Sequence, residues 1–296
     1  MSEAPADHLA VFQEHRPLMF ALAYRLLGRA TEAEDVLQDA YLRFRGAPLA
    51  EIESPRAYLS TIVTRLCLNQ LTSARAQRET YVGPWLPEPV LDTDHPELTS
   101  PEARAIESDT MSLAFLVLLE RLTPAERAVF LLREVFDYEY GEIAQILDRS
   151  EAACRQLFSR AKEHIVAERP RFQASPEEHR RLLEQFTRAA TNGDLDGLMA
   201  LLADDVTVWA DGGGKVPGAA LRPIHGRASV ARFVIGVTAQ FLPMNARAAV
   251  VEVNGKPTLL IRRGDGTPFV VVSIDVDGAR IRNVWAIGNP DKLGAV

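Results

Sequence analysis

The stretch "GEIAQILDRSEAACRQLFSRAKEHI", residues 141–165, decides how the first half of this chain is interpreted. Residues 141–147 have the spacing of a short amphipathic helix, and residues 148–150 follow as a tight turn. Ser150 is placed to cap a second helix. Two helices joined by so short a turn predict a helix-turn-helix, whose second helix enters the major groove of DNA. The apolar residues of that second helix share one face: Ala153, Leu157 and Ala161.

The remaining faces of the second helix carry side chains that suit DNA. Arginine and glutamine read base edges bidentately, while lysine and serine hold phosphates. The same pattern also fits the exposed face of an ordinary helical hairpin, and spacing alone does not separate the two interpretations. The candidate DNA-binding residues, with those of the turn, are Arg149, Ser150, Arg155, Gln156, Ser159, Arg160 and Lys162.

Length and composition set the outer limits. A chain of 296 residues predicts two or three domains, and 47% hydrophobic with 25% charged residues is typical of a soluble globular protein. The net charge of −7 does not exclude DNA, because basic residues gather locally. Without a membrane-length apolar run or a signal peptide, we expect a cytoplasmic protein. Cys67 and Cys154 lie in helical patterns and predict neither a disulfide nor a thiolate metal site.

The chain divides into four stretches. Helical periodicity runs through residues 7–78 and again through 109–170. Between them, residues 79–108 are proline-rich and acidic, which predicts an extended linker. Residues 175–296 read as two helices followed by strands with hairpin turns such as Asn254-Gly255. This order predicts an α+β domain with a curved antiparallel sheet and a cone-like cavity.

Two of these segments resemble a known family. "LTPAERAVFLLREVFDYEYGEIAQILDRSEAACRQLFSRAKEHI" (122–165) resembles region 4, and "LAYRLLGRATEAEDVLQDAYLRF" (22–44) resembles region 2, of extracytoplasmic-function (ECF) sigma factors. The resemblance implies two all-α regions that bind core RNA polymerase and direct it to promoters. Two positions depart from the family. Asp148 stands where glycine is frequent, and Tyr58 where many members have tryptophan. Because aspartate tolerates the left-handed conformation, we expect the turn to form.

The resemblance also implies three sets of contacts. An acidic face would meet the clamp helices of the polymerase beta-prime subunit through Glu34, Asp35, Gln38 and Asp39. The −10 element would face Arg65, Asn69 and Arg75. The −35 element would face the helix-turn-helix residues named above.

The last domain resembles the SnoaL-like branch of the NTF2-like superfamily. Three short motifs further resemble the SigJ-type subgroup of ECF sigma factors, and together they imply regulation between domains. Their residues are Trp85, Leu86, Pro87, Glu88 and Pro89 in the linker; Asp211, Gly212, Gly213, Gly214 and Lys215; and Asn289, Pro290, Asp291, Lys292 and Leu293 near the end.

The glycine motif "DGGGK" does not match a phosphate-binding P-loop. Such a loop needs Ser or Thr and a helix after its lysine, whereas Lys215 is followed by Val216, Pro217 and Gly218. Glycines also permit positive φ and close backbone approach, which favours docking of another segment. We expect Trp85 to anchor that segment and Glu88 to pair with Lys215. A plain turn with a solvated lysine is the alternative.

The cavity raises the question of catalysis. No carboxylate pair is clearly aimed into it, so we expect no catalytic residue, no metal and no cofactor, and a protein that is not an enzyme. The leading hypothesis is a sigma factor regulated in cis by its last domain. The alternatives are an isomerase- or cyclase-type enzyme, or a sensor of a small apolar ligand, fused to a DNA-binding module. A polymerase-independent repressor is disfavoured by the region 2 motif. Candidate cavity residues are Trp209, His225, Phe233, Phe241 and Trp285.

Overall fold

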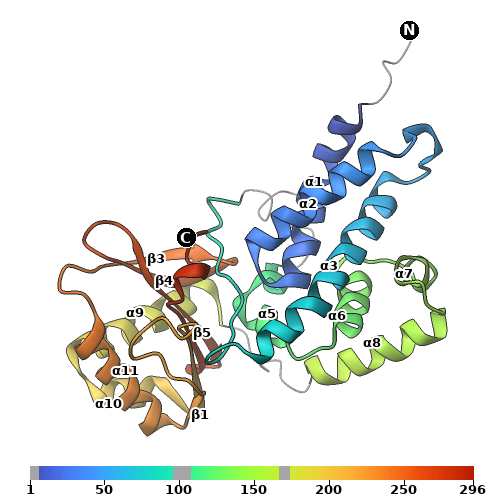
Figure 1. Ribbon diagram of the computed structural model, residues 1–296. Coiled ribbons are helices and arrows are strands. Elements are labelled where there is room, and N and C mark those ends of the chain that lie inside the picture. The colour runs from blue at the N-terminus through green and yellow to red at the C-terminus, as the bar shows by residue number, and fades with distance from the viewer. Residues whose placement is uncertain (1–6, 96–107, 167–173) are drawn as a thin grey trace. The chain divides into compact units, whose positions relative to one another are not determined.

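The computed structural model describes residues 7–95, 108–166 and 174–296 (Figure 1). The chain forms two compact units, and each is described by itself. The helical unit comprises Met1–Gln77 and His95–Glu168, and the C-terminal unit comprises Arg78–Asp94 and Arg169–Val296. Much of the segment predicted as a linker therefore belongs with the C-terminal unit.

Side-chain caps mark the starts of helices in the helical unit. The Ser54 hydroxyl accepts a hydrogen bond from the amide of Ala57 (3.3 Å) at the start of the third helix. Thr123 and Glu126 form a capping box at the start of α6. The elements are α1 (His8–Leu27), α2 (Ala30–Arg45), η1 (Leu49–Glu51), α3 (Pro55–Glu79), η3 (Ser108–Met111), α5 (Leu113–Leu119), α6 (Pro124–Phe130), the π-turn η4 (Leu131–Val135), α7 (Tyr140–Leu147) and α8 (Glu151–Val166).

Buried arginines connect the two halves of the helical unit. Arg25 of α1 donates to the Thr110 hydroxyl (2.9 Å), and burial lowers the pKa of its guanidinium to about 9. Arg127 of α6 donates to the carbonyl of Leu26 (2.7 Å) and pairs with Glu120 (2.7 Å). Because a buried charge is costly without partners, these contacts hold the first and second helical regions in one packed arrangement.

The C-terminal unit contains one six-stranded sheet in the order β2-β1-β6-β5-β4-β3. The hairpin predicted at Asn254-Gly255 is confirmed, with positive φ at both residues. The elements of the C-terminal unit are α9 (Pro176–Asn192), α10 (Leu195–Leu201), β1 (Leu202–Asp211), β2 (Ile224–His225), α11 (Arg227–Phe241), β3 (Arg247–Val253), β4 (Lys256–Arg262), β5 (Pro268–Asp277), β6 (Arg280–Ile287) and η5 (Pro290–Lys292).

The sheet is mixed and not purely antiparallel, which corrects the prediction. Strand β1 pairs in parallel with β6. The connection between these strands runs through α11 and four other strands, so no hairpin constrains their relative direction. The two-residue strand β2 was not predicted, because two residues are too short to show a periodic pattern.

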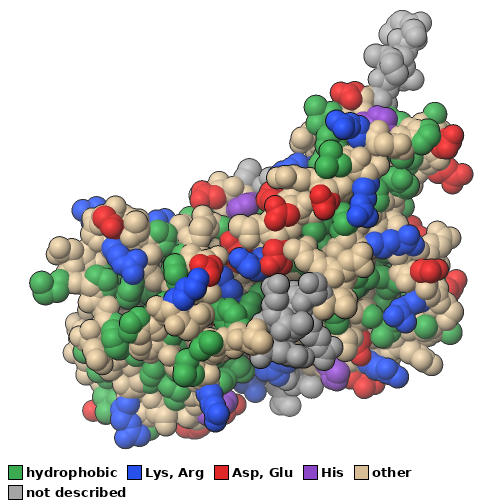
Figure 2. All heavy atoms as spheres, viewed as in Figure 1, with side chains coloured by type: hydrophobic (Ala, Val, Ile, Leu, Met, Phe, Trp, Pro, Cys, Tyr) green, Lys and Arg blue, Asp and Glu red, His purple; other side chains and the backbone are tan. Residues whose placement is uncertain are grey.

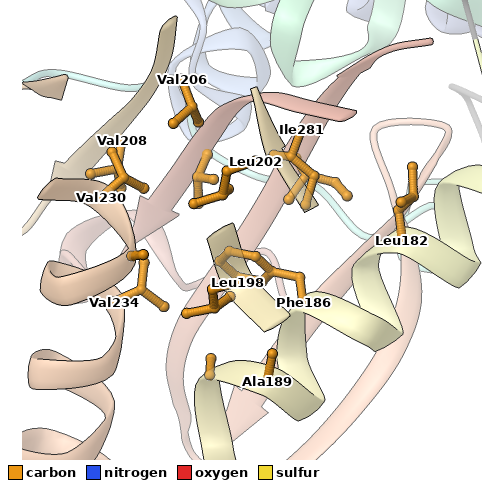
Figure 3. Close-up of a cluster of buried hydrophobic side chains, with 14 of the residues drawn as sticks. Leu182, Phe186, Ala189, Leu198, Leu202, Val206, Val208, Val230, Val234 and Ile281 are labelled. Atoms are coloured by element: carbon orange, nitrogen blue, oxygen red, sulfur yellow. The ribbon is translucent and has the colours of Figure 1, made fainter. Parts of the chain in front are cut away.

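One face of the sheet is covered by the three helices. Side chains from α9, α10, α11 and β1 point toward one another there, and together they form the core of the unit (Figure 3). Alternation along β1 directs every second side chain into this core, so the intervening residues face the opposite side of the sheet. The labelled core residues include Leu182, Phe186, Leu198, Val206, Val208, Val230 and Val234.

The surface shows no separation of charge on the face drawn in Figure 2, where basic and acidic side chains are interspersed. Across the described ranges, we find no helix with both the length and the apolar character needed to cross a bilayer.

Candidate functional site

Residues 80–94, which we call the strap, run across the C-terminal sheet. At one end the strap meets the last residue of β1, and at the other it forms an antiparallel bridge between Leu91 and Val253. The amide of Asn254 donates to the carbonyl of Val90 (3.0 Å), which fixes that end at the β3–β4 turn. Residues 86–90, which include four residues of the motif "WLPEP", are all buried.

The carboxylate of Asp211 holds the first end of the strap. Its Oδ2 accepts hydrogen bonds from the amide of Leu86 (2.8 Å) and from Nζ of Lys292 (2.6 Å), and its Oδ1 accepts from the hydroxyl of Tyr81. Asp211 is 1% exposed and Lys292 2%. The Asp211 cluster, as we call it below, consists of Asp211, Tyr81, Lys292, Leu86 and Asn289. The cluster joins the strap, the glycine loop and the C-terminal tail.

Lys292 is the most connected member of the cluster. Besides Asp211, its ammonium group donates to the carbonyl of Leu86. It also lies 4.0 Å from the ring centre of Trp85 and 5.0 Å from that of Tyr81, which are cation–π distances. Burial and the neighbouring carboxylate raise the pKa of the Tyr81 phenol, so this hydroxyl remains a donor at neutral pH. Asn289 completes the cluster by donating to the Tyr81 oxygen (2.8 Å).

The glycines of "DGGGK" permit the close approach of neighbouring segments. Gly213 and Gly214 have φ of 56° and 72°, which other residues rarely adopt. A Cβ at Gly213 would overlap the side-chain amide of Asn289, and one at Gly214 would lie 3.0 Å from Cβ of Val82 in the strap. The loop thus lies against both the tail and the strap, and no helix follows it as a P-loop would require.

The prediction that Lys215 pairs with Glu88 is wrong, because among the described residues Lys215 has another partner. Lys215 is about half exposed and pairs instead with Asp291 of the tail. Glu88 is completely buried, whereas the side chain of Lys215 lies at the surface. Among the other motif residues, Leu293 is buried and Pro290 is exposed.

The helix-turn-helix has the predicted turn. Asp148 adopts the left-handed conformation with φ of 52°, and the Ser150 hydroxyl accepts from the amide of Ala153 (3.2 Å). The buried face of α8 is centred one position later than predicted, because Ala153 and Leu157 are only half-buried. It consists of Cys154, Ala161 and Ile165.

The predicted −35 residues all lie on the solvent side of this motif. Arg155 is held by Glu151 (2.6 Å) and lies 4.5 Å from the ring centre of Tyr140. Lys162 is 3.7 Å from a carboxylate oxygen of Glu134. The exposed set is Arg149, Ser150, Arg155, Gln156, Ser159, Arg160 and Lys162.

The predicted polymerase-binding residues lie on α2. Asp35, Gln38 and Asp39 are exposed. Glu34 is half-buried and forms an ion pair with Arg16 of α1 (2.7 Å), which fixes it against the neighbouring helix. Three of the four side chains are therefore free to meet a partner surface.

The predicted −10 residues lie on α3. Arg65 donates to the carbonyls of Ile146 (2.9 Å) and Gln145 (3.0 Å) at the end of α7. Asn69 is exposed, and the side chain of Arg75 lies outside the described part of the chain. Within the helical unit, Arg65 is thus occupied by the helix-turn-helix region.

A cavity of about 310 Å³ lies between α9, α11 and the sheet. Phe233 and Phe241 line it, but Trp209, His225 and Trp285 are not among the described residues that do, which corrects the prediction. The strands contribute Val208, Ala210, Val284 and Ala286, so the tryptophans between them point to the opposite face. His225 instead contacts the Thr207 hydroxyl (3.0 Å).

The fold and these sites define a class of protein: a promoter-recognition factor with two helical regions and an attached α+β domain. Sigma-70 region 2 matches residues 11–77, Sigma-70 region 4 matches 112–165, and a SnoaL-like domain matches 183–287. The chain is 37% identical to the ECF RNA polymerase sigma factor SigJ of Mycobacterium tuberculosis, over 95% of this chain and 92% of that protein. It belongs to the ECF sigma factor family.

Two further comparisons agree with this assignment. The crystal structure of the Mycobacterium tuberculosis SigJ superposes with a TM-score of 0.77 at 32% identity, covering 97% of this chain and 98% of that one. The sigma factor SigG of the same organism is 28% identical over 98% of this chain and 86% of its own length. Sigma factors act with RNA polymerase on promoter DNA, and these relatives are sigma factors and not enzymes.

Proposed function

We propose that the C-terminal domain regulates this sigma factor in cis by holding the strap, which is part of the connection between its two promoter-binding regions. The observation that carries the proposal is the saturated carboxylate of Asp211, which binds Tyr81, Leu86 and Lys292 at once. A linker that only joined two regions would not need a buried carboxylate with this many hydrogen bonds. The bonded residues also come from all three motifs of the SigJ-type subgroup.

The helical unit supplies the polymerase and promoter contacts in this proposal. Asp35, Gln38 and Asp39 meet the polymerase clamp, and Glu34, held by Arg16, supports that face. The −35 element is read by the exposed side of α8. The −10 element is contacted by Arg65, Asn69 and Arg75, but Arg65 reaches DNA only after it leaves the carbonyls at the end of α7.

The two regions have to separate on a promoter. The −10 and −35 elements lie about 25 base pairs apart, which is about 85 Å along B-form DNA. A compact unit of this size has a radius of gyration of only about 15 Å. The segment 79–108 spans at most about 100 Å when fully extended, so nearly all of it is needed to bridge the elements.

The strap therefore sets how far the two regions can part. While it is docked, residues 80–94 keep one fixed path on the C-terminal sheet; once released, they add their full length to the linker. Run-off transcription with core polymerase compares the full chain with one that ends at residue 172. We expect both to require core polymerase and to differ in transcript yield. Equal yields from both would contradict regulation in cis.

A further inference from the structure

The cavity of the C-terminal domain has a wall made almost entirely of hydrocarbon. It encloses about 310 Å³ and is lined by aromatic rings from the helices and the sheet, together with aliphatic side chains of the strands. A pocket of this size and character holds small molecules in other proteins. The aromatic rings are those of Phe186, Phe233, Phe241 and Phe269.

This wall offers no countercharge to a charged ligand. Of the described residues that line the cavity, Asp211 has the single ionisable side chain, and its carboxylate is already saturated by the Asp211 cluster. The hydroxyls of Thr187 and Thr191 donate to carbonyls of their own helix (2.8 Å each). The third lining hydroxyl, that of Thr238, is uncharged and cannot neutralise a ligand's charge. A charged group placed here would lose its hydration without compensation, so the wall selects neutral molecules.

The rim of the cavity is the same loop that holds the strap. Residues 216–219, directly after "DGGGK", line the cavity, and so does Gly288, whose amide donates to the carbonyl of Asp211 (2.9 Å). The loop is packed onto itself: a Cβ at Gly212 would lie 2.6 Å from Cβ of Ala219. A change in the position of the rim is therefore transmitted directly to the residue that binds the strap.

We infer that this cavity binds a neutral, largely hydrocarbon small molecule, and that occupation of the cavity strengthens the hold on the strap. A ligand that contacts residues 216–219 in the docked arrangement stabilises that arrangement over any other. Linkage makes the effect reciprocal, so release of the strap weakens ligand binding. The regulatory consequence rests on the proposed function; the binding and its coupling to the strap do not.

A pair of fluorescent probes with closely related ring systems tests the binding. N-phenyl-1-naphthylamine is neutral, and 8-anilino-1-naphthalenesulfonate adds one negative charge. We expect the neutral probe to bind the full chain one to one, and the sulfonate to bind about tenfold or more weakly, because its charge finds no partner. Equal affinities, or no binding of the neutral probe, would overturn the inference.

Neighbouring residues of β3 give a matched pair of variants. Ala248 lines the cavity, whereas Ala249 lies on the other face of the same strand, and both are exposed. Ala248→Trp should abolish binding of the neutral probe, and Ala249→Trp should leave it unchanged. Ala286→Leu fills the cavity from β6 and serves as a second blocking variant. Unchanged binding in both blocking variants would place the probe elsewhere and overturn the assignment.

Hydrogen exchange measures the coupling without polymerase. The amides of Leu86, Leu91 and Asp92 are hydrogen-bonded when the strap is docked. We expect the neutral probe to slow their exchange in the wild type and not in Ala248→Trp, and Trp85→Ala to weaken probe affinity. Probe binding with no change in exchange would overturn the coupling. Because these readouts involve no transcription, their failure is distinct from failure of the regulatory proposal.

Discussion

At the scale of single residues, the ion pair between Asp211 and Lys292 dominates the C-terminal unit. Its two groups are 2.6 Å apart and almost fully buried, at 1% and 2% exposure. A buried pair gives little net stability against a hydrophobic replacement of both partners, but removal of one partner leaves an uncompensated charge. The second lysine of this region, Lys215, provides the natural comparison because its ion pair with Asp291 is exposed.

Lys292→Met and Lys215→Met are therefore expected to differ sharply in how much they lower the free energy of unfolding. The first should lower the free energy of unfolding of the C-terminal unit by about 3–5 kcal/mol, because it isolates the carboxylate of Asp211. The second should cost less than about 1 kcal/mol, as is usual for exposed pairs. Urea unfolding of the two full-length variants measures both quantities. Similar small losses in both would show that the Asp211 cluster does not hold the strap.

His179 makes stability depend on pH. Burial, followed by the positive charge of Lys256, lowers the pKa of its imidazole to about 4. The unfolded chain therefore binds the proton more readily, and the stability contribution, fully present above pH 6.5, is lost as pH falls toward 4. We expect the loss to approach about 3 kcal/mol.

His179→Gln removes this titration and is the control. Urea unfolding of the C-terminal unit at pH 7, 5.5 and 4.5 should show a shallower loss of stability in the variant than in the wild type. Because the other titratable groups are the same in both proteins, the difference between the two curves belongs to His179. Parallel curves would contradict the assignment.

Sequence reasoning singled out the three motifs that meet in the Asp211 cluster but not the contact pattern within it. The glycines, the apolar Trp85 and the tail motif each carry a recognisable local signal. No local signal in the sequence shows that Lys292, and not Lys215, is the partner of the buried Asp211. Both lysines are equally available in the sequence, and only the path of the folded chain decides which one is buried.

At the scale of elements, α8 is the part of the chain that we propose reads the −35 element. Its exposed side carries Arg160, which is open to solvent, whereas Arg155 is occupied by Glu151 and Tyr140. Arg155 must give up these contacts before it can bind DNA, so their loss offsets part of the free energy that its contact with DNA contributes. Arg160 has no such ion pair to give up among the described salt bridges.

Arg160→Ala is expected to weaken promoter binding in a sequence-dependent manner. Loss of a base-edge contact costs about 1–3 kcal/mol and relaxes specificity at one position, whereas loss of a phosphate contact weakens all sequences alike. Run-off transcription from a library of promoter fragments, read by sequencing, distinguishes the outcomes. Arg188→Ala, an exposed arginine of α9, removes the same charge as a control. An unchanged promoter profile would exclude Arg160 from recognition.

The elements themselves were largely predictable, because caps and periodicity are local. The turn at Asp148 and the hairpin at Asn254 were both found in this way. The parallel pairing of β1 with β6 was not, since it depends on contacts between distant parts of the chain. The tryptophans assigned to the cavity were wrong by one residue each, because an error of one position in a strand reverses the face.

At the scale of the whole molecule, assembly with polymerase is the first requirement. Asp35 lies exposed on α2, at the centre of the acidic face. Asp35→Arg should abolish retention of the full chain by immobilised core polymerase, because a like charge then opposes the partner surface. Glu53→Arg makes the same charge change at an exposed position before α3 and should retain binding. Equal retention of both variants would remove the α2 face from the interface.

Movement of the strap is the second requirement, and the structure supplies a way to prevent it. Leu91 and Val253 face each other in an antiparallel bridge, flanked by hydrogen bonds from Asp92 to Glu252 and from Asn254 to Val90. This is a non-hydrogen-bonded pair, in which the Cα atoms lie about 4.5 Å apart, as a disulfide requires. The native Cys67 and Cys154 are fully buried and should not interfere.

Run-off transcription by Leu91→Cys/Val253→Cys, oxidised and then reduced, tests the central claim most directly. Because the cross-linked strap cannot add its length to the linker, we expect the oxidised protein to give several-fold less transcript than the reduced protein. The wild type should respond to neither condition. Equal transcript from the oxidised and reduced variant, with the disulfide verified by mass spectrometry, would contradict control of initiation by the strap.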